Sequence, residues 1–285
     1  AGISGDMFLG ARLDAGCDAR RLLEELKKLS LGYFKLKRTH ALRGGIVGTR
    51  FEVETSGDQP HRKLTDIEAM IEPASLSASV KERALKIFRR LAEAEGKLHG
   101  KPASEVHFHE VGAVDAIIDI VGACVGLEVL EISELICSPL NVGGGRVEAA
   151  HGSLPVPAPA TAELLQGIPI YSSGVEGELV TPTGAAIIST LAASYGPFPS
   201  FKIERIGYGA GAKEFPHHPN VARLFIGEKL EAVKAEAGKA GDELVSIIEA
   251  NLDDMSPQLY GYLVDQALAA GALDVTCSSV QMKKN

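Results

Sequence analysis

The stretch from Val106 to Gly122 reads VHFHEVGAVDAIIDIVG, and the rest of the chain is organised around it. Its first part alternates apolar and polar side chains, so His107 and His109 would share one face of an extended segment. Its second part predicts a helix on which Asp115 and Asp119, four residues apart, share a face. Isoleucine and valine cover the other faces, so we expect this helix to be buried.

A buried helix must pair its carboxylates, hydrogen-bond them or bind a metal ion with them. Neutral imidazole and carboxylate together suit divalent nickel, zinc, iron or manganese. The ligands that we predict for a divalent ion are His107, His109, Glu110, Asp115, Asp119 and Asp6. A structural alternative stays open, in which the histidines lie on a strand edge and the aspartates cap neighbouring loops.

Composition sets the broad class of the protein. The chain has 285 residues and a formal net charge of −8, and it shows no basic stripe, so we expect two domains and no nucleic-acid partner. No signal peptide and no membrane-spanning pattern is predicted. The four cysteines are scattered without a C-x-x-C spacing: Cys17, Cys124, Cys137 and Cys277. They are typical of reduced, buried thiols, and we therefore expect a cytoplasmic protein.

Periodicity and capping signals predict an α+β protein. The expected helices are 7–15, 18–29, 66–72, 80–98, 160–166 and 184–194, and the expected strands are 33–39, 46–55, 135–138, 201–206 and 221–226. They form a larger mixed α/β domain, 1–228, that binds metal and substrate. A polar, Gly/Ala-rich linker follows at 229–243.

The last residues, 244–285, predict a truncated βαβ domain, which is the first half of a ferredoxin-like (split βαβ) fold. Its parts are a strand at 244–251, a helix at 256–270 and a strand at 273–280. Both ends of the chain look cut, so we expect a fragment with an incomplete second domain.

Three short segments resemble anion-binding turns. Asp6 follows a turn of small residues at the start of a helix, which suits a phosphate or a metal ion. Thr181, Thr183 and Gly184 begin another helix, and Gly209 and Gly211 lie in a glycine-rich segment that we expect to be a loop. The alternative for the first segment is a plain capped helix start.

His151 precedes a proline-rich arm, where it suits a ligand or a proton carrier, although a surface histidine is the alternative. In the second domain Asp253 and Asp254 follow a predicted strand, and Lys283 and Lys284 follow its predicted neighbour. Such a set suits a metal-bound triphosphate. The alternative is one capping aspartate and two solvated lysines.

Seven segments together resemble the LarC family of nickel insertion proteins. They are GISGDMFLG (2–10), HFHEVGAVD (107–115), AHGSLPVPAPAT (150–161), ELVTPTGA (178–185), GYGAG (207–211), NLDDM (251–255) and QMKK (281–284). The family extends beyond the last segment. Only His61 stands where members often carry a histidine-rich stretch, so the resemblance gives no support for nickel storage.

The resemblance implies a nickel chelatase, a metal-insertion lyase that loads Ni²⁺ into pyridinium-3,5-bisthiocarboxylic acid mononucleotide with CTP and Mn²⁺ or Mg²⁺. Replacing a ring C–H by C–Ni requires a base, for which the candidates are His107, His109, Glu110 and His151. Two other functions stay open: a metal-dependent nucleotide or phosphoester hydrolase, and a non-catalytic nickel-binding chaperone. The number of subunits also stays open, with a homo-oligomer among the alternatives.

Overall fold

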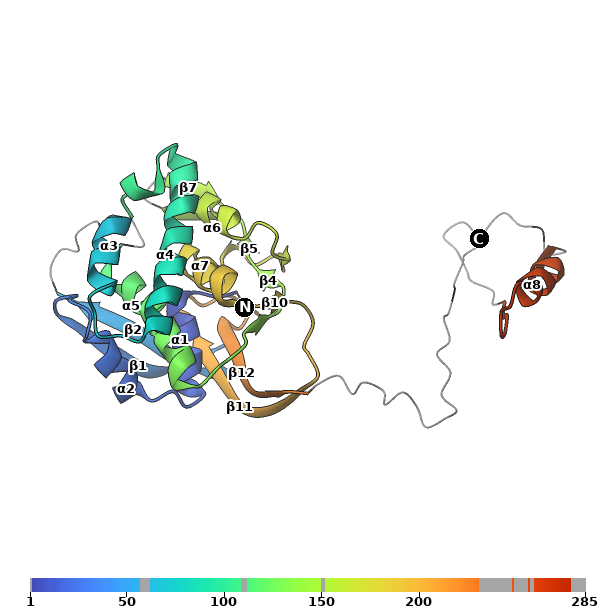
Figure 1. Ribbon diagram of the computed structural model, residues 1–285, viewed down its shortest axis with the longest axis horizontal. Helices are drawn as coiled ribbons and strands as arrows, with labels where there is room; N and C mark the ends of the chain where they lie inside the picture. Colours follow the sequence, from blue (N-terminus) through green and yellow to red (C-terminus); the bar gives the residue numbers. More distant parts are fainter. Residues whose placement is uncertain are drawn as a thin grey trace. The chain divides into compact units, whose positions relative to one another are not determined.

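The computed structural model describes residues 2–56, 62–108, 112–149, 152–230, 248, 256 and 259–277. The chain divides into two units, Ala1–Ala232 and Val233–Asn285, which we describe separately. In the larger unit the long strands lie together at one side, and most of the helices lie at the other (Figure 1).

The helices of the larger unit have the following bounds: α1 (Gly5–Asp14), α2 (Ala19–Leu26), α3 (Leu64–Ile71), α4 (Ala78–His99), the 3₁₀ turn η1 (Ala103–Glu105), α5 (Val114–Val129), α6 (Pro159–Leu164) and α7 (Pro182–Leu191). All six helices expected from the sequence are present, with ends shifted by up to three residues. Side-chain caps account for three of these starts, because Asp18 accepts a hydrogen bond from Arg20 N, Ser77 accepts one from Val80 N and Thr181 accepts one from Gly184 N.

Helix α5 confirms the prediction of a buried helix. Ile117, Ile118 and Ile120 have no exposed surface, and the helix packs against α1, α2, α4 and α7. Asp115 is exposed and Asp119 is half-buried, one turn apart on one face. The carboxylates therefore lie at an edge of this helix that protein leaves partly uncovered.

A four-stranded sheet contains the predicted hairpin, in the order β1 (Phe34–Arg43), β2 (Ile46–Thr55), β11 (Phe201–Ala210) and β12 (Val221–Lys229). Strands β1 and β2 pair antiparallel around Gly44 and Gly45, both of which have positive φ. Strand β2 meets β11 in parallel at Thr49 and Gly209, and β11 pairs antiparallel with β12. Helix α1 covers β2 and β11.

The predicted glycine-rich loop at 207–211 is wrong, because β11 continues to Ala210. A β-carbon on Gly207 would overlap the carbonyl oxygen of Ala11, and one on Gly209 would overlap that of Met7. A β-carbon on Gly211 would overlap the side chain of Asn220. These glycines let α1 and a loop residue approach the strand, so the space beside Gly209 and Gly211 is filled by protein.

Eight short strands complete the larger unit: β3 (Ile136–Cys137), β4 (Leu140–Asn141), β5 (Gly143–Gly144), β6 (Arg146–Ala149), β7 (Gly152–Pro155), β8 (Ile170–Tyr171), β9 (Gly177–Glu178) and β10 (Ser194–Tyr195). They pair two by two, β3 with β10, β4 with β8, β5 with β9 and β6 with β7.

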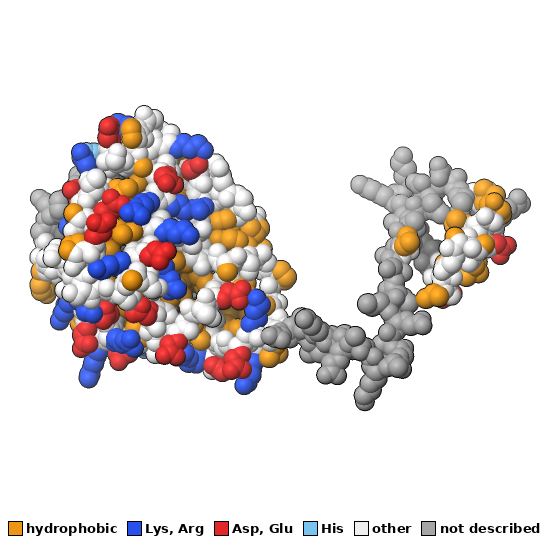
Figure 2. Space-filling view, in the orientation of Figure 1, with side chains coloured by type: hydrophobic (Ala, Val, Ile, Leu, Met, Phe, Trp, Pro, Cys, Tyr) orange, Lys and Arg blue, Asp and Glu red, His pale blue; other side chains and the backbone are white. Residues whose placement is uncertain are grey.

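On the visible face of this unit basic and acidic side chains are interspersed (Figure 2).

The smaller unit contains helix α8 (Leu259–Ala269), within the predicted range of 256–270. Gly271 follows it with a φ of 102°, and its N–H donates to Leu268 O, as expected for a glycine that ends a helix. The predicted strand at 273–280 is absent from its described part, 273–277. A strand needs a hydrogen-bonded neighbour, and no second strand of this unit lies among the described residues.

Across the described ranges, no helix combines the length and the apolar character that crossing a membrane would require. All four cysteines are free thiols. Cys17 and Cys124 are buried, as expected, whereas Cys277 is exposed. Burial raises the pKa of Cys124 to about 12, which keeps that side chain a neutral thiol.

Candidate functional site

A cavity of about 450 Å³ lies where three helices of the larger unit begin. Its walls come from four segments that are distant in the sequence, and the lining residues are Ser4, Gly5, Asp6, Arg50, Phe51, Glu52, Val53, Asp115, Asp119, Glu178, Thr181, Pro182 and Thr183. The volume lies in the range of small-molecule sites, about 300–1,000 Å³. Carboxylate, hydroxyl and guanidinium groups all line it.

The first turns of α1, α5 and α7 all border this cavity. Backbone N–H groups at a helix start lack helical partners and carry a partial positive charge, so they favour anions. Asp6 already uses one of them, because its Oδ1 accepts a hydrogen bond from Met7 N at 2.9 Å. It also accepts one from the Ser4 hydroxyl. The site therefore combines positive helix ends with negative side chains.

A short parallel bridge brings two of these helix starts together. Ile3 pairs with Val180, and Thr181 N donates to Ile3 O at 3.1 Å. A β-carbon on Gly184 would overlap Ile3 O, so glycine at this position lets α7 approach the turn before α1. The two turns predicted as separate anion sites thus form neighbouring walls of one cavity.

Helices α1 and α5 run side by side in the same direction away from the cavity. Gly5 contacts Asp119, Gly122 leaves room for Leu9, and Gly126 leaves room for Arg12. The Arg12 guanidinium donates to Ala123 O and stacks on a phenylalanine of its own helix. Glycines on both helices thus set the close approach that places Asp6 and Asp119 on one cavity wall.

Arg50 is the single basic side chain among the described residues that line the cavity. Its Nη1 lies 3.3 Å from Asp6 Oδ2, and its Nη2 lies 3.2 Å from Glu52 Oε1. The Arg50 side chain is 18% exposed. One guanidinium therefore neutralises two carboxylates on one side of the cavity.

Asp119 lines the same cavity without such a partner. Among the described residues, no hydrogen bond or ion pair reaches its carboxyl group. Burial, followed by the negative charges of Asp6 and Asp115, raises the pKa of Asp119 well above its usual value. The group is surrounded by protein but still reaches the cavity, which explains why it is desolvated and partly accessible at once. A cation in the cavity would offset the free-energy cost of ionising the Asp119 carboxyl group.

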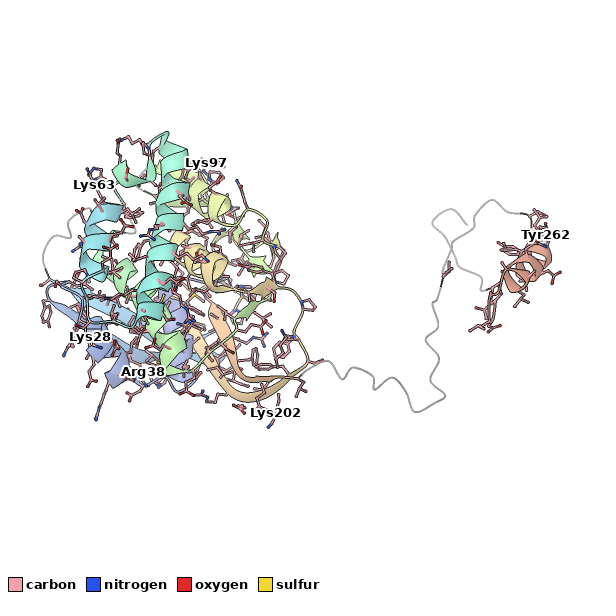
Figure 3. All side chains as sticks on the ribbon, in the orientation of Figure 1. Lys28, Arg38, Lys63, Lys97, Lys202 and Tyr262 are labelled. Carbon is pink, nitrogen blue, oxygen red and sulfur yellow. The ribbon has the colours of Figure 1, made fainter. Side chains whose placement is uncertain are left out.

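The cavity brings together three of the six predicted metal ligands: Asp6, Asp115 and Asp119. His107 does not line it. His107 pairs with Lys63 in an isolated bridge at the start of α3, where Figure 3 labels the lysine, and its side chain is exposed between buried Val106 and Phe108. In the part of the chain that the structure describes, no three His, Cys, Asp or Glu side chains are arranged to hold one metal ion.

The predicted phosphate turn is only partly available to a ligand. Thr181 uses its hydroxyl as the cap of α7, accepting from Gly184 N at 3.2 Å, and Pro182 has no N–H. Thr183 lines the cavity with a hydroxyl that has no hydrogen-bond partner among the described residues. Thr183 is therefore the better donor to an anion than Thr181.

The remaining predicted site residues fall outside the described ranges. They are His109, Glu110, His151, Asp253, Asp254, Lys283 and Lys284. The residues on either side of the 150–151 segment form the antiparallel pair β6 and β7.

Sequence reasoning missed Arg50, Glu52 and Glu178 as members of the site. The first two belong to a strand whose charges resemble a solvated face. Only Glu178 carried a signal, because it opens the ELVTPTGA segment that supports the family resemblance.

The chain matches the family described as "Nickel insertion protein" over residues 1–285. Two proteins of Desulfitobacterium hafniense, strains DCB-2 and Y51, are 50% and 49% identical to it over 285 residues. Both are named pyridinium-3,5-bisthiocarboxylic acid mononucleotide nickel insertion protein. Each alignment covers 100% of this chain and 70% of the relative.

A protein of Dictyoglomus thermophilum is 45% identical over 284 residues, covering 100% of this chain and 72% of its own length. No solved structure matches this chain. The match to the family over the whole chain, together with relatives at about half identity, shows that this chain belongs to the nickel insertion protein family.

Proposed function

We propose that this chain takes part in inserting Ni²⁺ into pyridinium-3,5-bisthiocarboxylic acid mononucleotide, and that the cavity at the starts of α1, α5 and α7 holds both reactants. One observation carries this assignment. The carboxylates predicted to bind metal and the turn predicted to bind phosphate line the same cavity. A site that joins a divalent cation to an anionic nucleotide needs carboxylates for the cation and hydrogen-bond donors for the phosphate close to each other.

The chemistry of the donor set supports this assignment. Asp6, Asp115 and Asp119 offer oxygen ligands but no complete metal site, and no cysteine lines the cavity. A low affinity for the ion suits a protein that transfers its metal to a substrate. The substrate brings two thiocarboxylate sulfurs, which are the softer ligands that nickel accepts. Carboxylates at the cavity would thus present the ion, and the substrate would complete its coordination.

The phosphate of the mononucleotide would lie against the start of α7. There Thr183 supplies a hydroxyl and the helix supplies its positive end. Placing the phosphate at this wall would leave the pyridinium ring to face the carboxylates that line the same cavity.

The ring carbon that bonds to nickel must lose a proton, and a side chain has to accept it. His107 does not line the cavity, so the base that we propose is His109, Glu110 or His151. Phe108 and Gly112 flank the first two of these and lie in the segment that leads into α5. A neutral imidazole or a carboxylate within reach of that carbon would accept the proton.

We also propose that the reaction uses CTP with Mn²⁺ or Mg²⁺, and that Asp253, Asp254, Lys283 and Lys284 contact the triphosphate. The family resemblance and the charges of these residues support this part. The overall reaction would be that of a chelatase of the lyase class.

The test is to incubate the protein with Ni²⁺, CTP and the dithiolated mononucleotide and to follow the products by mass spectrometry. We expect the nickel-bound nucleotide. Hydrolysed nucleotide without nickel product would indicate a hydrolase, and nickel uptake alone would indicate a chaperone. The Asp115→Asn and Asp119→Asn double variant should lose the product, whereas Arg89→Gln, remote from the cavity, should keep it.

A further inference from the structure

We infer that Arg50 is a built-in competitor of the metal ion: its guanidinium holds the place of a cation at Asp6 until nickel displaces it. This inference rests on the proposed function, because it assumes that nickel enters this cavity. The guanidinium is the one basic group among the described lining residues, and it lies between two carboxylates, at 3.3 Å from Asp6 and 3.2 Å from Glu52.

The Arg50 guanidinium makes two contacts to Glu52 and one contact to Asp6. Its Nε and Nη2 both lie 3.2 Å from Glu52 Oε1, on the same strand β2. Only Nη1 reaches Asp6 Oδ2. Breaking the single contact to Asp6 therefore leaves Arg50 anchored to Glu52, so the exchange costs one charge-assisted hydrogen bond and does not detach the side chain.

Asp6 is prepared for either cation. Its Oδ1 is held by Met7 N and the Ser4 hydroxyl, so the carboxylate stays in one orientation with Oδ2 directed at Arg50. A divalent ion at Oδ2 would also lie on the wall shared with Asp119, which has no partner among the described residues. An ion at this place would be attracted by both carboxylates, which line the same cavity, whereas the Arg50 guanidinium contacts only Asp6 there.

Displacement gives the freed end of Arg50 a new role. Its Nη1 would then be an unpaired donor on the cavity wall, available to an anionic group of the substrate. Nickel entry and anion binding would be coupled through this one side chain, and such coupling is reciprocal. The cavity would bind the anion poorly until the metal is present, which favours the order in which the metal binds first.

The test measures Ni²⁺ binding to the full chain by calorimetry, with no nucleotide present. Removing the competing charge in Arg50→Gln should tighten nickel binding about tenfold, since a like charge at this range costs roughly that much. Arg50→Lys keeps the charge and should bind nickel much as the parent does. Arg89→Gln removes a distant positive charge, paired with Glu68 at 2.8 Å, and should change nothing.

A double-mutant cycle tests whether Arg50 and nickel compete at Asp6. In an Asp6→Asn background the gain from Arg50→Gln should largely vanish, because the contested carboxylate is gone. If Arg50→Gln folds but binds nickel no more tightly, the inference is wrong while the site stands, provided that Asp6→Asn and Asp119→Asn weaken binding. If neither aspartate variant weakens binding, the proposed site itself fails, and the inference fails with it.

A structure of the parent protein soaked with nickel tests the same point without any substitution. We expect Arg50 to remain on Glu52 and to leave Asp6. Nickel bound in the cavity with the Arg50–Asp6 contact intact would overturn the inference.

Discussion

Gly5 and Asp119 touch at the point where α1 and α5 leave the cavity, and the contact is so close that a β-carbon on Gly5 would overlap the carboxyl group of Asp119. The only side chain that fits at residue 5 is therefore a hydrogen atom. This contact links the position of a site carboxylate to the packing of two core helices.

We expect Gly5→Ala to push Asp119 from its place and to destabilise the fold by about 1–3 kcal/mol, the usual cost of overpacking. Chemical denaturation measures this loss, and calorimetry should show weaker nickel binding in the variant that remains folded. Gly196→Ala is the matched control, because no atom lies within 4 Å of its β-carbon position. Equal stability of the two variants would contradict the contact.

Asp119→Asn should stabilise the metal-free protein at neutral pH while it weakens nickel binding. The raised pKa means that the folded protein disfavours the charged carboxylate, and the amide removes this cost. We expect a gain of about 1 kcal/mol, or about 2–4 °C in Tm for a domain of this size. A loss of stability in the variant would show that the carboxylate has a structural partner.

The same substitution should change the pH dependence of stability. The folded form of Asp119 keeps a proton that the unfolded chain loses at about pH 3.9, so stability from this group falls as pH rises from there to the raised folded pKa. The Tm gain of Asp119→Asn should therefore be small near pH 4 and should grow toward neutral pH. Thermal melts across this range measure it, and a constant gain would contradict the prediction.

The two threonines before α7 should separate binding from stability. Thr183→Val removes a cavity hydroxyl without a described partner, so substrate affinity should fall by about 1–2 kcal/mol with little change in Tm. Thr181→Val removes the helix cap and should cost about 1 kcal/mol of folding stability. Calorimetry with the mononucleotide and thermal melts distinguish the two. Unchanged affinity in Thr183→Val would exclude this wall as the phosphate site.

Gly209→Ala tests whether the glycine-rich segment serves packing. We expect a loss of about 2–3 kcal/mol in the free energy of unfolding, because the new methyl group would meet the backbone of α1. If the segment instead bound an anion from a loop, the variant would keep its stability and lose only affinity. Denaturant titration and substrate calorimetry on the same preparation decide between these outcomes.

Local patterns predicted most of the helices and the hairpin. Helix α5 was predictable because a helix that is apolar on nearly all faces is stable only when it is buried. Strands β1 and β2 were predictable from apolar and polar residues that alternate on both sides of two glycines. The extent of β11 was not predictable. Its last part is rich in glycine, which signals a loop, and only the close approach of α1 makes glycine favourable in that strand.

The site was predicted in pieces. Asp115 and Asp119 followed from helical spacing, and Thr183 followed from the helix start, but nothing local placed them together. The bridge between Ile3 and Val180, which are distant in the sequence, brings the start of α7 beside the start of α1, and the packing of α1 on α5 brings Asp119 to the same cavity. Arg50 was missed because charges on an edge hairpin usually face water, and only its pairing with Asp6 identifies it.

The cavity can form only after the ribosome has synthesised all four segments that line it, and these segments are distant in the sequence. A ribosome adds about 5–20 residues per second, so residues 178–183 follow residues 4–6 by roughly 9–35 s. By the end of that interval the nascent chain carries Asp6, Arg50 and Asp119, but the last wall of the cavity is still missing. Nickel capture should therefore report completed folding of the larger unit, and a chain released early should leave the metal to other cellular ligands.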